Sequence, residues 1–281
     1  MVSEKTVTFD KVKIEEKEEE LDHSKVSFQN KHTDRKINNK KVKNNVRYQI
    51  LYFNDEQLKK LETGVTETLK SSDETISPNG GKLYVAIKRL LDIVLSLLSI
   101  IILSPLFVVV SVLIFWEDKG TPFFSQPRLT KNGKPFKMYK FRSMYLDAEE
   151  RFEEIQKLNE TDGLAFKMEN DPRVTAIGKF IRKTSIDELP QLINVLLGHM
   201  SIIGPRPPLP REVIHYTPYQ MNRLVVKGGL SCYCQCSGRS NMGFDEWVDS
   251  DIKYIKERSL IVDAKVVAKT CLAVLRQNGA K

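Results

Sequence analysis

Apolar and polar positions divide the chain into a long polar start, one uncharged apolar run and a mixed remainder. The run from Ile93 to Trp116 contains no charged residue. As a helix, these 24 residues would be about 36 Å long, whereas the hydrocarbon core of a bilayer is about 30 Å thick. The pattern therefore predicts a membrane helix within residues 82–119.

Charges on both sides of this run favour a helix that returns to the face from which it entered. Lys82, Lys88 and Arg89 precede the run, and seven basic residues follow it between positions 119 and 142. A spanning helix should have more Lys and Arg on its cytoplasmic side than on its outer side. Ser104 and Pro105 lie at the middle, where proline removes a helical hydrogen bond. We expect a re-entrant helix broken there, with a span as the alternative, because membrane helices tolerate proline.

Shorter elements follow the apolar run. Phe123 to Met144 predicts a β-hairpin, because Asn132-Gly133 is a tight-turn signal between residues of strand character. Apolar positions between Phe244 and Leu275 predict two amphipathic helices, which could lie on the membrane surface or pack on the core. The expected fold is mainly α with a small β element, membrane-anchored by the re-entrant helix and carrying amphipathic surface helices.

The start of the chain has a different composition. Residues 1–81 are expected to be a charged, largely disordered tail and linker, because they contain few apolar clusters that could offset the entropy of ordering. Within this region, Val46 to Leu69 carries enough apolar residues to form a strand and a helix or to dock on a partner. The predicted domains are therefore the tail and linker (1–81), the membrane helix (82–119) and a cytoplasmic domain (120–281).

Composition narrows the classes of partner. Hydrophobic residues make up 41% of the chain, which is enough for a core, and the formal net charge is +8. Such a charge indicates anionic partners: nucleic acid, an acidic membrane surface or phosphorylated substrates. The membrane run argues against nucleic acid. Three cysteines between Cys232 and Cys236 are too closely spaced for a typical zinc site, and reduced thiols are expected.

The strongest candidate for chemistry is the adjacent pair Asp187 and Glu188. Two neighbouring carboxylates repel each other, and Arg182 and Lys183 close by could keep them ionised and available to a metal or a phosphate. A structural explanation is equally compatible with the local sequence, because Ser185 followed by Glu188 is a capping-box pattern. Pro190 favours a helix that starts at Asp187 or Glu188, which would place the proline in the first turn.

A second candidate lies in the proline-rich segment from Gly204 to Pro210. It holds one basic residue, Arg206, between prolines. Arginines in such segments are often solvated, yet a guanidinium fixed by prolines is also well suited to clamp a phosphate. Spacing alone leaves both possibilities open.

Taken together, these motifs resemble the bacterial sugar transferase family of monotopic polyprenyl-phosphate hexose-1-phosphate transferases. The resemblance covers about Leu83 to Lys281 and depends on the order of the motifs. In sequence they are Lys88-Arg89-Leu90-Leu91-Asp92, Ser104-Pro105, Lys140-Phe141-Arg142-Ser143-Met144, Thr184-Ser185-Ile186-Asp187-Glu188-Leu189-Pro190-Gln191, Met200-Ser201-Ile202-Ile203-Gly204-Pro205-Arg206-Pro207 and Gln235-Cys236-Ser237-Gly238-Arg239.

The resemblance implies an enzyme, a phosphoglycosyl transferase. It would transfer a sugar 1-phosphate from a nucleotide sugar, usually a UDP-sugar, to undecaprenyl phosphate. Asp187 would be the nucleophile that forms an aspartyl phosphosugar, and Glu188 would help to hold Mg²⁺. The implied substrate-binding residues are basic: Arg206 first, then Arg128, Lys140, Arg142, Arg173, Arg182 and Arg239.

The same resemblance implies a place in the cell and in a pathway. The expected location is the cytoplasmic face of the bacterial inner membrane, where Ser104 and Pro105 would keep the active site. The expected process is the first membrane step of exopolysaccharide, capsule or lipopolysaccharide assembly. Expected partners are the nucleotide sugar, the polyprenyl phosphate and membrane lipids, but not nucleic acid. A homo-oligomer and contacts with glycosyltransferases of the pathway stay open.

Two positions depart from the family pattern. His199 stands where the family commonly has Asp, and Cys232 stands where it commonly has Gly. These departures motivate an alternative function: a catalytically weakened, membrane-bound interaction partner of such a pathway. Neither the sugar nor the role of residues 1–81 follows from the sequence.

Overall fold

A computed structural model describes residues 53–148, 171–236 and 243–275, so residues 1–52 of the expected tail and linker (1–81) lie outside them. Leu58–Lys281 forms one compact unit. The main elements are α2 (Asp55–Ser71), α3 (Lys82–Asp118), β1 (Phe123–Leu129), β2 (Pro135–Phe141), α5 (Ala176–Lys183), α6 (Gln191–Leu196), β3 (Ser201–Ile203), β4 (Gly229–Ser231), α10 (Phe244–Glu257) and α11 (Leu260–Leu275). Shorter helical turns are η1 (Lys131–Gly133), η3 (Ile186–Glu188), α7 (Pro210–Val213), α8 (Pro218–Met221), η4 (Asn222–Leu224) and α9 (Tyr233–Cys236). The prediction of a mainly helical fold with a small β element is confirmed.

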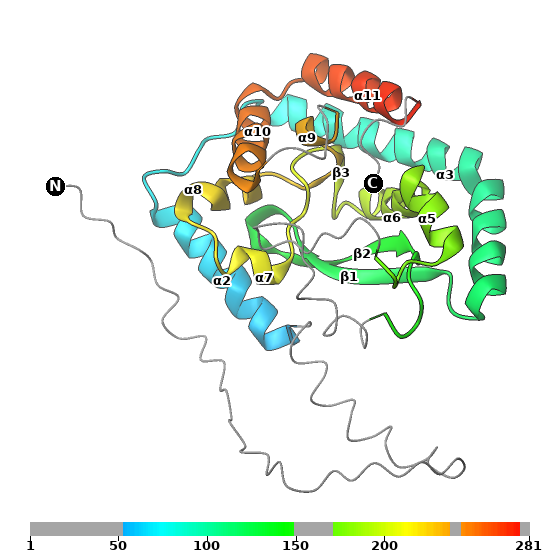
Figure 1. Cartoon of the computed structure of the whole chain (residues 1–281). Helices are drawn as coiled ribbons and strands as arrows, with labels where there is room; N and C mark the ends of the chain where they lie inside the picture. The colour runs from blue at the N-terminus through cyan, green and yellow to red at the C-terminus, as the bar shows by residue number, and fades with distance from the viewer. Residues whose placement is uncertain (1–52, 149–170, 237–242, 276–281) are drawn as a thin grey trace, which may run out of the picture. The chain divides into compact units, whose positions relative to one another are not determined.

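The predicted membrane helix is α3. It is long and apolar enough to cross a membrane, and only 11% of its most apolar window is buried, unlike the core helix of a soluble protein. The helix passes through Pro105 without an interruption in its assignment, and the Ser104 hydroxyl donates to the carbonyl of Ile101 at 2.8 Å. Figure 1 shows that α3 nevertheless changes direction sharply along its length. The predicted break is therefore a bend within one helix.

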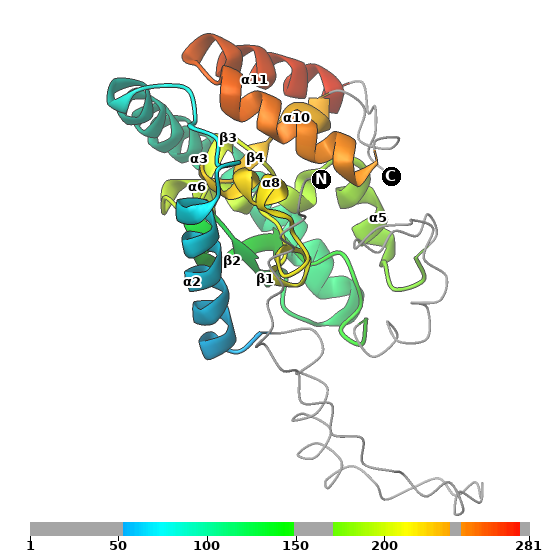
Figure 2. The same ribbon diagram turned by 90° about the vertical axis from the view of Figure 1, so that its left-hand side faces the viewer.

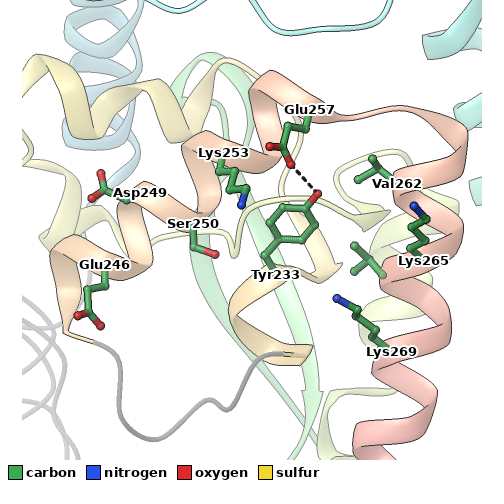
Figure 3. Close-up of a pocket in the computed structure, with 10 residues that line it drawn as sticks. Tyr233, Glu246, Asp249, Ser250, Lys253, Glu257, Val262, Lys265 and Lys269 are labelled. Atoms are coloured by element: carbon green, nitrogen blue, oxygen red, sulfur yellow. Dashed lines mark hydrogen bonds between the residues drawn. The ribbon is translucent and has the colours of Figure 1, made fainter.

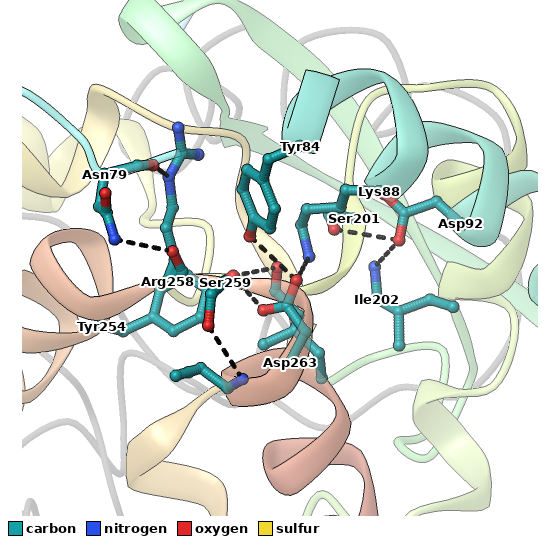
Figure 4. A network of polar contacts seen from close by, with 12 residues as sticks. Asn79, Tyr84, Lys88, Asp92, Ser201, Ile202, Tyr254, Arg258, Ser259 and Asp263 are labelled. Carbon is teal, nitrogen blue, oxygen red and sulfur yellow. Dashed lines mark hydrogen bonds and ion pairs between the residues drawn. The ribbon is translucent and has the colours of Figure 1, made fainter. Parts of the chain in front are cut away.

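The first half of α3 is held by a polar network (Figure 4). Asp263 on α11 accepts hydrogen bonds from Tyr84 and Lys88, at 2.9 and 2.8 Å. Asp92 is buried and accepts from the Ser201 hydroxyl and the Ile202 backbone, at 3.1 and 2.9 Å. These contacts attach the start of the apolar helix to β3 and α11.

The second half of α3 is held by apolar packing and by its last carboxylates. Val110 and Ile114 form a buried cluster with Phe141 of β2 and Ile181 of α5. Glu117 accepts hydrogen bonds from the first backbone N–H groups of α5, the nearer at 2.8 Å. Both ends of α3 therefore bind the same compact unit.

Strands β1 and β2 form the predicted hairpin. They pair antiparallel, with Arg128 opposite Phe136. The expected tight turn is present as η1, in which Asn132 and Gly133 both have positive φ, 59° and 76°. A Cβ on Gly133 would lie 2.9 Å from the side chain of Val65, so glycine also permits α2 to pack against the turn.

Helix α2 belongs to the region that the sequence groups with the tail, and it is the helix expected within Val46 to Leu69, of which residues 46–52 lie outside the described residues. Leu58, Leu61 and Val65 are buried. The segment that follows is fastened by Asn222, whose amide accepts from the Ile76 backbone at 2.7 Å and donates to the Glu74 carbonyl at 3.1 Å. Residues 58–81 are thus packed on the rest of the unit.

The two C-terminal helices lie side by side (Figure 2) but differ in burial. Helix α10 packs on the core through Val248, Ile252 and Ile255. On α11, Val266 is buried, whereas Ile261 and Leu272 are 69% and 50% exposed. Of the two options for these helices, packing on the core describes α10, whereas the exposed apolar residues of α11 leave the membrane-surface option open for that helix.

Candidate active site

The carboxylate pair lies in a short turn between two helices. Helix α5 ends at Lys183, and Ser185 takes the left-handed conformation with φ 58°, which turns the chain into η3. Asp187 and Glu188 belong to this 3-10 turn, and α6 begins only after Pro190. Ser185 makes no side-chain cap, and Pro190 occupies the N-cap of α6. Neither a capping box at Ser185 nor a helix starting at the carboxylates is present.

Three cations gather around this pair. Lys140 Nζ is 3.0 Å from Glu188 Oε1 and 3.8 Å from Asp187 Oδ2. The Arg206 guanidinium contacts the same Glu188 oxygen at 3.3 Å. Arg128 lies close enough to influence both Arg206 and Glu188 electrostatically. The fold thus brings together residues from β1, β2, η3 and the proline-rich segment.

Asp187 differs from Glu188 in being buried without hydrogen-bond donors. Its side chain is 11% exposed, and no described residue donates a hydrogen bond to its carboxylate. Burial raises the pKa of Asp187, Lys140 opposes that rise, and Glu188 adds to it. A buried carboxylate without a donor is costly unless another positive or polar group completes its environment. The position therefore suits a group that reacts or binds a ligand.

Arg128 is fixed in a way that leaves part of it unsatisfied. Its guanidinium donates to the Pro207 carbonyl at 2.9 Å and to Gln126 at 3.1 Å. Its Nε is buried and has no partner among the described residues. Burial lowers the pKa of Arg128 to about 10, helped by the neighbouring Arg206. An anion beside the two guanidinium groups would relieve this repulsion.

Arg206 is held from behind by residues that sequence reasoning missed. Arg223 donates to the Arg206 carbonyl at 3.3 Å, to Asp251 at 2.8 Å and to the Tyr216 hydroxyl at 2.6 Å. Arg223 and Asp251 are both buried. A signal for them existed, since Asp251 shares a helical face with Val248 and Ile255 and needs a partner there.

The other arginines that the sequence assigns to substrate binding lie in different surroundings. Arg142 is buried and pairs with Asp118 at the end of α3. Arg173 forms a two-pronged pair with Asp171, at 2.9 and 2.6 Å. Arg182 is exposed on α5 and influences Asp187 only through its charge. Arg239 lies outside the described residues.

The carboxylates fit Mg²⁺ in the manner usual for phosphate chemistry. Within the described residues there is no cluster of three or more acidic, His or Cys side chains that would form a complete protein cage. Mg²⁺ is commonly held by one or two carboxylates, with substrate phosphates and water completing its shell. Asp187 and Glu188 could supply those carboxylates. A dedicated metal centre independent of substrate is not indicated.

A cavity elsewhere in the unit is lined by acidic and basic side chains together (Figure 3). It measures about 450 Å³ and lies between α10 and α11. Its acidic and basic side chains are equal in number: Glu246, Asp249, Glu257, Lys253, Lys265 and Lys269. The lining therefore carries no net preference for an anion, and the candidate active site remains the carboxylate turn.

Fold and site together define a class of protein: a compact unit attached to an apolar helix, with two carboxylates facing cations that suit phosphate groups. The chain belongs to the bacterial sugar transferase family, whose model matches residues 83–277. This match includes the membrane helix and every described member of the candidate site. Helix α2 lies outside it.

Named relatives agree with this assignment. The chain is 45% identical over 201 residues to "Galactosyl transferase CpsE" of Streptococcus agalactiae. The matched segment covers 70% of this chain and 44% of that protein. It is 41% identical over 201 residues to "Undecaprenyl-phosphate galactose phosphotransferase" of Salmonella typhimurium, covering 69% and 41%. It is 36% identical over 197 residues to "Exopolysaccharide production protein ExoY" of Rhizobium meliloti, covering 69% and 87%. The chain thus spans less than half of the two longer relatives.

Proposed function

We propose that this protein transfers a sugar 1-phosphate from a nucleotide sugar, in the first place a UDP-sugar, to undecaprenyl phosphate. The observation that carries the proposal is the buried, donor-free carboxylate of Asp187 next to Lys140 and Arg206. The named relatives support the reaction class, because one of them is an undecaprenyl-phosphate galactose phosphotransferase. The reaction would begin the assembly of a surface polysaccharide.

The reaction proceeds in two displacements. In the first, an Asp187 oxygen attacks the phosphorus that bears the sugar, an Asp–phosphate bond forms, and the phosphoanhydride breaks to release UMP with its electron pair. In the second, an oxygen of undecaprenyl phosphate attacks the same phosphorus, and Asp187 leaves as a carboxylate. Two steps suit one soluble and one membrane-bound substrate, since both need not be bound at once.

The surrounding cations have distinct tasks in this scheme. Lys140 and Arg206 neutralise charge on the phosphate oxygens, and the nearby Arg128 adds positive charge to the site. Glu188, with Asp187 beside it, would hold Mg²⁺, which supplies further charge neutralisation on those oxygens. Arg223 and Asp251 keep the backbone of Arg206 in place.

The membrane arrangement in this proposal is re-entrant. If α3 spanned the bilayer, its ends would lie on opposite faces, about 30 Å apart. Instead, Asp92 near one end and Glu117 at the other both bind the same compact unit. This supports a helix that bends near Pro105 and leaves the active site on the cytoplasmic face, where nucleotide sugars are made.

An assay of UMP release tests the proposal. Purified full-length protein, Mg²⁺, undecaprenyl phosphate and a panel of UDP-sugars should give UMP with at least one sugar. Asp187→Asn should lower the rate by at least about a thousandfold. Asp245→Asn, which changes an exposed residue of α10, should leave the rate unchanged. Turnover by Asp187→Asn at the native rate would exclude the aspartyl intermediate. No turnover with any sugar would favour the weakened, partner-binding alternative.

The topology has its own test. Single cysteines replace Lys82 and Lys131 in a chain without native cysteines, and intact cells are treated with an impermeant thiol reagent. Both positions should be protected until the membrane is opened. Labelling of one of them in intact cells would show a spanning helix.

A further inference from the structure

A cluster of basic side chains lies where α3 enters the apolar region, away from the carboxylate turn. We call it the basic patch, and it consists of Arg89, Lys131, Lys134 and Lys227. Arg89 belongs to α3, the next two flank the hairpin turn η1, and Lys227 follows η4. The three lysines are exposed.

Gly198, just after α6, brings two of these cations together. A Cβ on Gly198 would lie 3.2 Å from the Arg89 guanidinium and 3.7 Å from Lys227 Nζ. The missing side chain therefore leaves a gap between two positive groups. Arg89 is held in place by donating to the Val195 and Leu196 carbonyls, at 2.7 and 2.8 Å.

The hairpin turn brings the other two cations to the same place. The Thr130 hydroxyl donates to the His199 carbonyl at 2.7 Å, which holds the start of the turn beside Gly198. Lys134 and Lys227 both lower the pKa of His199, after the larger effect of burial. Burial also lowers the pKa of Lys227, with Arg89 and Lys131 adding to that effect and Asp92 opposing it. Arg89 and Lys131 thus both lie near Lys227, and Lys134 and Lys227 both lie near His199.

Their positive charge is not compensated by ion pairs. Within the described part of the chain, Lys131, Lys134 and Lys227 form no side-chain hydrogen bond or ion pair. Asp92, which lies near Lys227, is buried and already accepts hydrogen bonds from Ser201 and Ile202. Lys88 and Lys140, in contrast, each have a carboxylate partner. An external anion would relieve the repulsion in the patch.

Exposed apolar side chains adjoin the patch. Leu90 and Leu91 follow Arg89 on α3 and are 61% and 43% exposed. Leu197, next to the carbonyls that Arg89 binds, is 56% exposed. The uncharged run of α3 begins at Ile93, two residues after Leu91. In an inserted helix, this junction would lie at the depth where lipid head groups meet acyl chains.

We propose that the basic patch is a docking surface for the head groups of anionic phospholipids, such as phosphatidylglycerol. The cations meet the lipid phosphates, and the exposed leucines meet the adjoining acyl chains. Each basic residue near an anionic bilayer strengthens binding by about fivefold, so the patch distinguishes anionic from zwitterionic lipid. The inference rests on membrane insertion of α3 and not on turnover.

Lipid retention by the purified full-length protein tests this inference. The protein is incubated in detergent with equal amounts of phosphatidylglycerol and phosphatidylcholine, and bound lipids are counted by native mass spectrometry. Wild type should retain phosphatidylglycerol preferentially. In the patch variant, the ratio of bound phosphatidylglycerol to bound phosphatidylcholine should be at least about tenfold lower. The patch variant carries Lys131→Gln, Lys134→Gln and Lys227→Gln. A control with equal charge loss carries Lys59→Gln, Lys253→Gln and Lys256→Gln, all exposed outside the patch.

A second variant keeps the test valid if the triple change impairs folding. His199→Asp places a carboxylate beside Lys134 and Lys227, and should reduce phosphatidylglycerol retention by about fivefold, whereas His199→Asn should not. The inference is overturned if wild type retains both lipids equally. Equal loss in the control, or unchanged retention in the patch variant and in His199→Asp, would also overturn it.

The substrate lipid is the competing occupant of the patch. If the cations hold undecaprenyl phosphate instead, the patch variant will raise the KM for that substrate even in nanodiscs of pure phosphatidylcholine. That result would replace the proposal. An unchanged KM there, together with lost phosphatidylglycerol retention, would support it. Because retention needs no turnover, an inactive protein would still answer the question of lipid binding.

Discussion

Ion pairs in the interior and ion pairs at the carboxylate turn use the same residue types, but the charges meet at different distances. Arg223 meets Asp251 at 2.8 Å, both side chains are at most 1% exposed, and Tyr216 takes a further hydrogen bond. At the turn, Lys140 is shared between two carboxylates and is 3.8 Å from Asp187. A close, buried pair fixes the fold, whereas the longer contact leaves the Asp187 carboxylate able to react.

Breaking the close interior pair should give the largest effect. Asp251→Asn leaves the buried Arg223 without its counter-charge, and we expect a loss of about 3–5 kcal/mol in the free energy of unfolding. Chemical unfolding in detergent measures this loss. Asp245→Asn, exposed on the same helix, is the control and should cost well under about 1 kcal/mol. Similar losses of unfolding free energy in both variants would show that the interior ion pair is not what stabilises the fold there.

Removing the shared cation should affect catalysis more than stability. Lys140→Met is expected to lower kcat/KM by about a hundredfold, because it removes charge neutralisation at the transferred phosphate. The midpoint of unfolding should change little. Lys137→Met, exposed on the same strand, provides the matched variant and should keep near-native activity. A stability loss as large as that of Asp251→Asn would make Lys140 a structural residue.

The Arg173–Asp171 pair allows a test by pH. Burial opposes ionisation of Asp171, but its hydrogen bonds and ion pair with Arg173 lower its pKa overall. Asp171→Asn should therefore cost about 1–3 kcal/mol near neutral pH. The stabilisation is present above the unfolded pKa of about 3.9 and is lost as pH falls through the lower folded pKa. The stability difference between wild type and variant should be constant above about pH 5 and shrink below about pH 4.

An exposed arginine near the turn should give the smallest effect. Arg182 influences Asp187 through solvent, and no close ion pair with that carboxylate is formed. Arg182→Gln should lower kcat/KM by less than about threefold, and added salt should remove the difference. Rates measured at two salt concentrations provide the check. A tenfold loss that persists in high salt would place Arg182 directly on the substrate.

Features that depend on neighbouring residues could be predicted from the sequence. The uncharged run identified α3, Asn132-Gly133 identified the hairpin turn, and the adjacent carboxylates marked the candidate site. Each signal lies within one short stretch, where hydropathy or turn chemistry constrains the backbone directly. A bend in α3 was also expected from the sequence, although the helix continues through Pro105.

Features that depend on tertiary contacts could not be predicted. Arg206 and Arg173 look alike in sequence, yet one contacts Glu188 and the other closes a pair with Asp171. Lys140 and Glu188 are 48 positions apart, so only the fold reveals that they meet. The helix start expected at the carboxylates was wrong because Ser185 adopts a left-handed conformation and diverts the chain into a separate turn.

Because of helix α2, the folding unit begins earlier in the chain than the family match does. The family match begins at Leu83, yet Val65 is fully buried against the hairpin turn, and Asn222 has its amide bonded to residues 74 and 76. A chain shortened to its family segment would lose the buried side chains of α2 and would leave Asn222 Oδ1 without its Ile76 donor. Such a truncation should aggregate even though every proposed catalytic residue is retained, so expression work on this protein should start upstream of Asp55.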